Sequence, residues 1–143
     1  MFKKILVCSD GSDYARDAAL VTVQVAAHFK AEVVALNVFP TFLAAMGVWN
    51  LAMGQDVMDD YAKAQKENVT KHIVPLFAHE GVQCRVVQEL GHPVSGIVRV
   101  AEREKADLIV VGNRGVGGPK EVFLGSVSNG ILHHAPCPVL IVR

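Results

Sequence analysis

Five apolar runs of strand length alternate with segments of helical periodicity, and this alternation restricts the folds open to the chain. Continuous apolar runs are typical of strands that are buried on both faces, and the helical segments between them can serve as crossovers between parallel strands. The pattern therefore predicts an α/β fold, a doubly wound and mostly parallel five-stranded sheet with helices on both faces. The expected strands are Lys3–Cys8, Glu32–Phe39, Gln83–Glu89, Asp107–Gly112 and Pro138–Arg143.

Four helices are predicted between these runs, each from residues that recur at helical spacing. Pro75 lies inside the second helix and is expected to kink it or to split off its last turn. The segment Pro40–Gly54 matches neither period and is expected to form a long loop or a loose helical turn. The expected helix faces are Ala15, Ala18, Ala19, Thr22, Ala26 and Phe29; Met58, Tyr61, Gln65, Val69, Ile73 and Phe77; Val94, Ile97, Val98 and Ala101; and Val127, Ile131 and Leu132.

Length and composition favour a single cytoplasmic domain spanning residues 1–143. Hydrophobic residues make up 51% of the chain and charged residues 20%, which suits a well-packed globule. The formal net charge is zero, which argues against sequence-independent binding to nucleic acid. No apolar run approaches the roughly 20 residues of a membrane-spanning helix, and no signal peptide is evident. The three cysteines, Cys8, Cys84 and Cys137, lack CxxC spacing, which favours free thiols in a reducing compartment.

The stretch GNRGVGGPKEVFLGS, residues 112–126, has the composition of an anion-binding turn. It follows the fourth apolar run and precedes the fourth helix, so backbone N–H groups and the helix N-terminus can converge on a phosphate. Gly112 and Gly115 permit positive φ and let a ligand approach the backbone. Gly125 and Ser126 are expected to open the fourth helix.

Other groups of this segment can assist. The hydroxyls of Ser126 and Ser128 and the backbone N–H of Val127 are candidate phosphate donors, although the serines can also act as caps. Arg114 and Lys120 can offset phosphate charge, or they are solvated loop cations.

Asp10 is the candidate ligand in the loop that follows the first strand. Its carboxylate can accept hydrogen bonds from ribose hydroxyls or help to hold a metal carried by phosphates, or it can stabilise the turn at Gly11. Ser12 is expected to be the N-cap of the first helix, with Asp13 in its first turn. If the strand order is 3-2-1-4-5, the first and fourth strands are neighbours and both loops lie at one edge of the sheet.

Other known signatures are absent from the sequence. No GxxxxGK[ST] and no GxGxxG occurs, which argues against a P-loop or a dinucleotide-binding site. The histidines lack metal-ligand spacing, and His92 is expected to have a role at a helix start. Cys8 is expected to be a small structural hydrophobe rather than a reactive thiol.

On the basis of these residues, the chain resembles the universal stress protein family, and within it the ATP-binding subgroup that has the motif G-x2-G-x9-G-[ST]. Gly112, Gly115, Gly125 and Ser126 match that motif with both spacings intact. The similarity extends over the opening KKILVCSDGS, the segment ADLIVVGNRG and the closing CPVLIVR. It implies an adenine nucleotide alpha hydrolase-like fold with strand order 3-2-1-4-5, and ATP as the ligand, with or without Mg.

The resemblance also implies roles for individual residues. Backbone groups around Cys8 and Val38 would meet adenine, Asp10 the ribose, and the glycine loop through Ser128 the phosphates. A homodimer would form through the last strand, Val139–Val142, and an apolar edge strand is by itself a reason for pairing with a partner.

The function implied is that of a dimeric regulator or sensor in the stress response, which reads its nucleotide and acts on an unidentified protein partner, rather than that of an enzyme. Two alternatives are a slow ATP hydrolase or phosphotransfer enzyme, and a module that binds AMP or a cyclic nucleotide. A further alternative is a partner-binding scaffold without nucleotide affinity.

Overall fold

The computed structural model describes residues 1–39, 55–113 and 125–143. The five strands form one parallel sheet in the order β3-β2-β1-β4-β5, which confirms the predicted fold class and strand order. The elements in chain order are β1 (Lys4–Cys8), α1 (Asp13–Phe29), β2 (Glu32–Phe39), α3 (Gln55–Ala78), β3 (Cys84–Leu90), α4 (Pro93–Glu104), β4 (Leu108–Gly112), α5 (Ser126–His134) and β5 (Val139–Val142).

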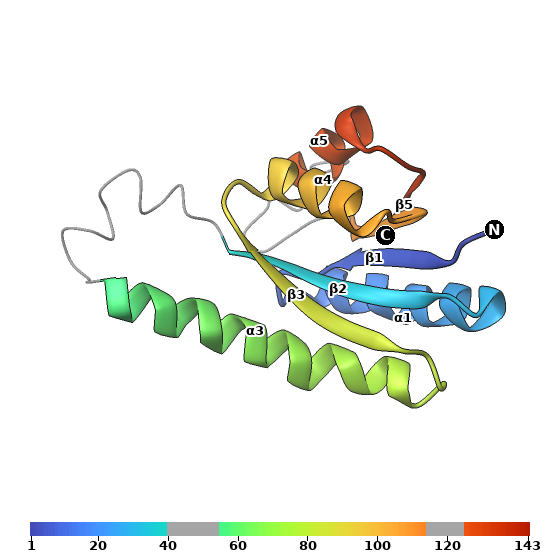
Figure 1. Cartoon of the computed structure of the whole chain (residues 1–143), viewed down its shortest axis with the longest axis horizontal. Helices are drawn as coiled ribbons and strands as arrows, with labels where there is room; N and C mark the ends of the chain where they lie inside the picture. Colours follow the sequence, from blue (N-terminus) through green and yellow to red (C-terminus); the bar gives the residue numbers. More distant parts are fainter. Residues whose placement is uncertain (40–54, 114–124) are drawn as a thin grey trace.

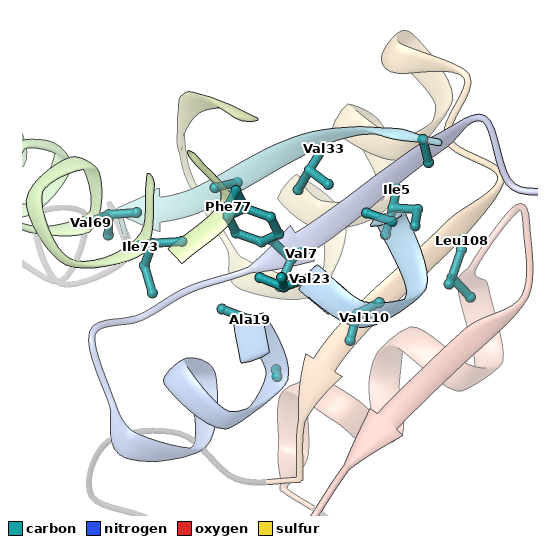
Figure 2. Close-up of a cluster of buried hydrophobic side chains, with 14 residues drawn as sticks. Ile5, Val7, Ala19, Val23, Val33, Val69, Ile73, Phe77, Leu108 and Val110 are labelled. Carbon is teal, nitrogen blue, oxygen red and sulfur yellow. The ribbon is translucent and has the colours of Figure 1, made fainter. Parts of the chain in front are cut away.

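Helices cover both faces of the sheet, as Figure 1 shows: α1 and α3 lie on one face, and α4 and α5 lie on the other. Alternate residues of each strand point to opposite faces, so each strand contributes to two separate hydrophobic clusters. Ile5 and Val7 of β1 pack beneath α1 and α3 together with Phe77 (Figure 2). Leu6 packs on the other side against residues of α4 and α5 such as Ile97.

Helix α1 starts where the sequence predicted. The Ser12 hydroxyl accepts a hydrogen bond from the backbone N–H of Ala15 at 3.2 Å, and Asp13 lies in the first turn, where the helix dipole favours an anion. The small side chains of the buried face let the helix lie close to the sheet. Phe29 was wrongly placed on that face: its side chain is 39% exposed and its ring packs edge-to-face on Phe2, with the centroids 5.1 Å apart.

Helix α3 agrees only in part with its prediction. The helix runs without a break through Pro75, so its last turn is not split off, while a kink at the proline stays a prediction. Ile73 and Phe77 are buried on either side of the proline, and these contacts hold the last turn on the sheet. Tyr61 and Gln65, expected on the sheet-facing side, are exposed, but Gln65 does face the sheet, since its Oε1 accepts a hydrogen bond from Asn37 Nδ2 at 3.4 Å. The segment Pro40–Gly54 lies outside the described residues.

A chain of amides ties the N-terminal half of α3 to the strand ends. Asn37 of β2 is 1% exposed, and its Nδ2 donates to the Ser9 carbonyl at 3.0 Å. Gln88 of β3 donates from Nε2 both to Asn37 Oδ1 at 3.0 Å and to the carbonyl of Ala62 in α3 at 2.6 Å. A buried amide is tolerated when its groups are paired, as these are. The Ser9 backbone is thereby fixed next to Asp10.

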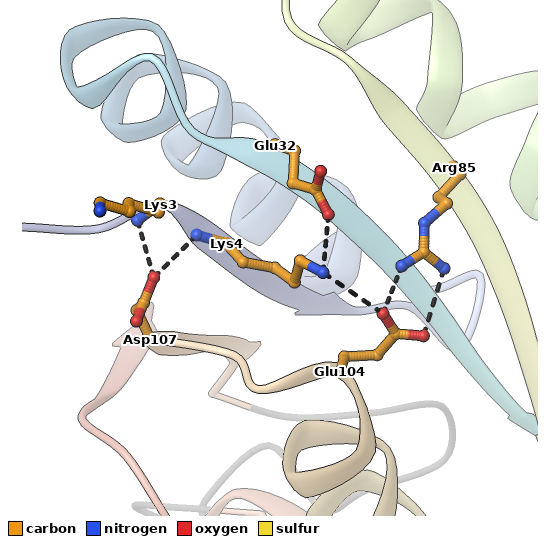
Figure 3. A network of polar contacts seen from close by, with 6 residues as sticks. All are labelled: Lys3, Lys4, Glu32, Arg85, Glu104 and Asp107. Atoms are coloured by element: carbon orange, nitrogen blue, oxygen red, sulfur yellow. Dashed lines mark hydrogen bonds and ion pairs between the residues drawn. The ribbon is translucent and has the colours of Figure 1, made fainter.

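At the opposite, amino-terminal edge of the sheet, charged side chains bridge β1, β2, β3 and α4 (Figure 3). Lys4 Nζ lies 2.9 Å from a carboxylate oxygen of Glu32 and 3.7 Å from one of Glu104. Arg85 pairs with both carboxylate oxygens of Glu104 and lowers the pKa of that carboxyl group. These pairs are partly exposed, so each adds little to stability.

Asp107 at the same edge supports a prediction about acid stability. Its Oδ2 accepts hydrogen bonds from the backbone N–H groups of Lys4 at 2.9 Å and Lys3 at 2.7 Å, and these bonds lower its pKa. A depressed folded-state pKa stabilises the fold above the unfolded pKa of about 3.9, and this contribution is lost as the pH falls through the folded value.

We therefore expect Asp107→Asn to lower the free energy of unfolding at pH 7 by at most about 1 kcal/mol, since water replaces part of what is lost. The difference from the wild type should shrink at pH 3. Urea unfolding at both pH values measures this, with the exposed Asp17→Asn as control. A difference that is equal at pH 7 and pH 3 would contradict the assignment.

Candidate functional site

The two loops singled out in the sequence leave the sheet side by side. β1 and β4 pair in parallel with Val7 opposite Val110, so their carboxyl ends meet at one edge. The chain passes from β1 into α1 on one face and from β4 into α5 on the other. Strand order thus reverses between β1 and β4, the place where open α/β sheets bind ligands.

Asp10 is exposed at this edge and shapes its own loop. Its Oδ1 accepts a hydrogen bond from the Ser12 N–H at 2.9 Å, and the turn is completed by Gly11 at φ 83°. The turn-stabilising role considered for Asp10 is therefore present in the structure. It orients the carboxylate at the edge, and whether a ribose also contacts it stays a prediction.

Cys8 and Val38 lie half-buried on the sheet face covered by α4 and α5, and Val127 of α5 shares that hydrophobic cluster. The three residues come from β1, β2 and α5 and form an apolar surface next to Asp10. Burial, assisted by the charge of Asp10, raises the pKa of the Cys8 thiol far above its ordinary value. Cys8 is therefore a neutral thiol, which agrees with its predicted structural role.

Gly112 corrects one prediction. Its φ is not positive; instead, a Cβ at this position would lie 2.8 Å from the carbonyl oxygen of Tyr14 in α1. Glycine is required because β4 ends directly against the first turn of α1. The residue therefore sets the distance between the two loops rather than a left-handed turn.

Residues 113 and 125 are hydrogen-bonded to each other across the glycine loop. The Gly125 N–H donates to the Asn113 carbonyl at 2.8 Å, and the Asn113 N–H donates to the Val142 carbonyl of β5 at 2.7 Å. The Ser128 hydroxyl, 3% exposed, donates to the carbonyls of Asn113 at 3.2 Å and Gly125 at 3.0 Å. In this arrangement Ser128 joins the start of α5 to Asn113, but its hydroxyl donates to carbonyls, which is not the N-cap bond left open for it.

Among the described residues, no side chain caps the N-terminus of α5. Gly125 is the N-cap residue in extended conformation, and no cap hydrogen bond from a side chain is formed there, whereas Ser12 caps α1. The first N–H groups of a helix lack intrahelical partners, so those of Ser126, Val127 and Ser128 can meet an anion. Ser126 is exposed at this position. Arg114 and Gly115, also predicted for the site, lie outside the described residues.

Two further glycines bring the surrounding helices close. A Cβ on Gly130 of α5 would lie 2.7 Å from Cγ2 of Val94 in α4, and one on Gly96 of α4 would lie 3.2 Å from Cγ1 of Val38. His92 is the N-cap residue of α4 and Pro93 its first residue, which confirms the helix-start role predicted for His92. Within the described residues no group of three potential metal ligands occurs, and no helix there could span a membrane.

Sequence reasoning missed three residues that shape this edge. Tyr14 meets Gly112 through its backbone, Asn37 fixes Ser9, and Asn113 joins β4 to α5. For Asn113 a signal was present, a polar residue directly after a buried apolar strand and inside the glycine motif. The contacts of Tyr14 and Asn37 depend on how distant elements pack, and no local sequence pattern predicts them.

The fold defines a doubly wound α/β protein whose strand order reverses between β1 and β4. The model of the universal stress protein family matches residues 1–143. The Thermus aquaticus universal stress protein in the QAH/OAS sulfhydrylase 3′ region is 36% identical over 147 residues, with all of both chains covered. The chain therefore belongs to the universal stress protein family.

Two solved structures share the fold at lower identity. The Archaeoglobus fulgidus universal stress protein in complex with dAMP is 18% identical with a TM-score of 0.73, and covers 100% of this chain and 98% of that one. A universal stress protein in complex with cAMP is 23% identical with a TM-score of 0.70, and covers 99% and 97%. At these identities the likeness concerns the fold.

We expect Gly112→Ala to lower the free energy of unfolding by about 1–3 kcal/mol, because the methyl group meets backbone atoms that cannot rotate away. Urea unfolding measures the loss. The same substitution should weaken the binding of any ligand at this edge, since it moves the two loops apart.

Gly81→Ala provides the control. Gly81 has φ 68°, so alanine is strained there, but the residue lies at the far edge of the sheet. It should lower stability without changing ligand affinity. If Gly112→Ala is as stable as the wild type, the close approach to Tyr14 does not hold in solution.

Proposed function

We propose that this chain is an ATP-binding universal stress protein, a dimeric regulator whose nucleotide lies at the carboxyl ends of β1 and β4. The observation that carries the proposal is the N-terminus of α5, which has no side-chain cap among the described residues and directly follows the glycine loop, after the strand that pairs with β1. The intact spacing of Gly112, Gly115, Gly125 and Ser126 supports the same ligand.

Each part of a nucleotide has a complementary group at this edge. Phosphate oxygens are acceptors, and the N–H groups of Ser126, Val127 and Ser128 are donors at the positive end of a helix dipole. The Asp10 carboxylate suits ribose hydroxyls, which donate. The half-buried apolar side chains of Cys8 and Val38 suit the adenine ring. Magnesium would be carried by the phosphates of ATP.

The relatives solved with dAMP and cAMP favour one second candidate, a module for an adenine mononucleotide. The two candidates differ in the number of phosphates that the α5 N-terminus and the glycine loop must accept. Competition of AMP and cAMP against ATP separates them. Catalysis is not part of the proposal, because a binding role needs no group beyond those described.

Calorimetric titration of nucleotide-stripped protein with ATP and magnesium tests the binding proposal. We expect saturable binding with one site per chain, weakened about tenfold in Asp10→Ala because a charge-assisted hydrogen bond to a hydroxyl is lost. Asp17→Ala, an exposed carboxylate of α1, is the matched control and should bind as the wild type does. No binding at millimolar ATP would overturn the proposal.

The homodimer is proposed through β5, which is an edge strand of the sheet. All four of its residues are apolar and only partly buried. The carbonyls of Pro138 and Val142 accept hydrogen bonds from β4, so by strand alternation the N–H and C=O groups of Val139 and Ile141 point outward. An exposed apolar strand edge is normally covered, and a second copy in antiparallel register would cover it.

Ile141→Pro removes one outward donor and leaves the bonds to β4 in place. We expect sedimentation to change from about twice the chain mass of 15.4 kDa to the monomer mass. Ile141→Val keeps the N–H group and should remain dimeric. A wild-type chain that sediments as a monomer at micromolar concentration would contradict the dimer.

A further inference from the structure

One buried polar atom near the proposed site lacks a hydrogen-bond partner. Asn113 is 8% exposed, and its Oδ1 is the buried side-chain atom of the described residues for which no partner is found. A buried acceptor that has left water without gaining a donor is costly, so such atoms usually have a functional reason. The buried amide of Asn37, by comparison, is paired at both of its ends.

The backbone of Asn113 is held in place by its neighbours. Its N–H is bonded to β5 through Val142, and its carbonyl accepts from Gly125 and from the Ser128 hydroxyl. The strand end and the helix start are thus joined at this residue, and the side chain projects from a fixed point. Such a side chain can discriminate between ligands, because little of the binding energy is spent on ordering it.

Asn113 and Asp10 follow the carboxyl ends of neighbouring strands. β4 and β1 pair in parallel with Val110 opposite Val7; Asn113 comes directly after β4, and Asp10 comes two residues after the end of β1. Ile109 and Val111 of β4 face α4 and α5, so by alternation Asn113 faces the same side. That is also the side of Cys8 and Val38. Two acceptors therefore stand at neighbouring strand ends, next to the uncapped start of α5.

An unpartnered acceptor selects for a donor. Phosphate oxygens accept hydrogen bonds, so they are served by the helix N–H groups and not by Asn113 Oδ1. The donors of an adenine nucleotide are the ribose hydroxyls and the adenine amino group, and a strand-end position beside Asp10 suits the ribose. Free ribonucleotides offer two hydroxyl donors, at the 2′ and 3′ positions.

We propose that Asn113 is a specificity residue, whose side-chain oxygen accepts one ribose hydroxyl while Asp10 accepts the other. The inference rests on the proposed function and narrows its ligand class to adenine ribonucleotides with both hydroxyls free. Nucleotides of the kinds bound by the relatives solved with dAMP and cAMP each lack one of these donors. This chain should therefore discriminate against both.

The test compares ATP, 2′-deoxy-ATP and 3′-deoxy-ATP by calorimetry on the wild type and on Asn113→Leu, which keeps the side-chain size and removes the acceptor. We expect the wild type to bind each deoxy analogue about tenfold more weakly than ATP, which corresponds to about 1.4 kcal/mol. In Asn113→Leu, the affinity ratio between ATP and one of the two deoxy analogues should fall to about one. The ratio between ATP and the other analogue, which is set by Asp10, should persist.

Asn129→Leu makes the same chemical change at an exposed position of α5 and should leave both ratios as in the wild type. If Asn113→Leu does not fold, Asn113→Ser provides a second variant. Its shorter side chain should also lose the discrimination between ATP and the deoxy analogue. If neither variant folds, the wild-type ratios decide, because equal affinity for the three nucleotides overturns the inference.

Other outcomes separate this inference from the proposed function. Wild-type discrimination that persists fully in Asn113→Leu contradicts the role of Asn113 while ATP binding stands. Asn113→Leu could instead weaken the binding of ATP, 2′-deoxy-ATP and 3′-deoxy-ATP by one common factor, and weaken ATP binding more than AMP binding. That result would indicate a contact to phosphate and would also overturn the inference. Absence of any ATP binding by the wild type defeats the proposed function itself.

Discussion

Parallel pairing between β1 and β4 is the interaction on which the rest of the candidate site depends. The register that sets Val7 opposite Val110 brings two loops together that are about a hundred positions apart in the chain. Crossovers leave these two strands toward opposite faces, so no helix of the described residues closes the edge between them. The site is therefore a consequence of topology, and side chains then determine its chemistry.

Close approaches at glycine set the dimensions of this edge. Gly112 allows β4 to end against the backbone of Tyr14, and Gly130 allows α5 to pack directly on Val94 of α4. The two helix starts at the edge differ in their N-cap residues: the Ser12 hydroxyl accepts a bond from the first turn of α1, whereas Gly125, the N-cap residue of α5, has no side chain to do so. The proposed phosphate position follows from that difference.

The fold could be predicted from the sequence because its strands are buried on both faces and read as continuous apolar runs. Strand order came from the family resemblance and its spaced glycine motif, and the structure agrees with it. Caps such as Ser12 and His92 could be predicted because they depend on neighbours in the chain.

Contacts between distant elements could not be predicted. Helical spacing placed Phe29, Tyr61 and Leu132 with the buried faces, but each is more than a third exposed. Positive φ was the freedom that the sequence suggested for Gly112, because a glycine motif does not distinguish positive φ from close packing. Asn113 was passed over, since its lack of a partner becomes visible only in three dimensions.

An NMR titration of the isotope-labelled protein with ATP shows directly whether the ligand lies at the carboxyl edge of the sheet. We expect the amide signals of Asp10, Asn113 and Ser126–Ser128 to shift in a saturable manner. The opposite edge holds a hollow of about 580 Å³ lined by residues that include Lys3, Lys30 and Glu80. Shifts confined to that hollow, with the carboxyl edge unchanged, would contradict the proposed position of the nucleotide.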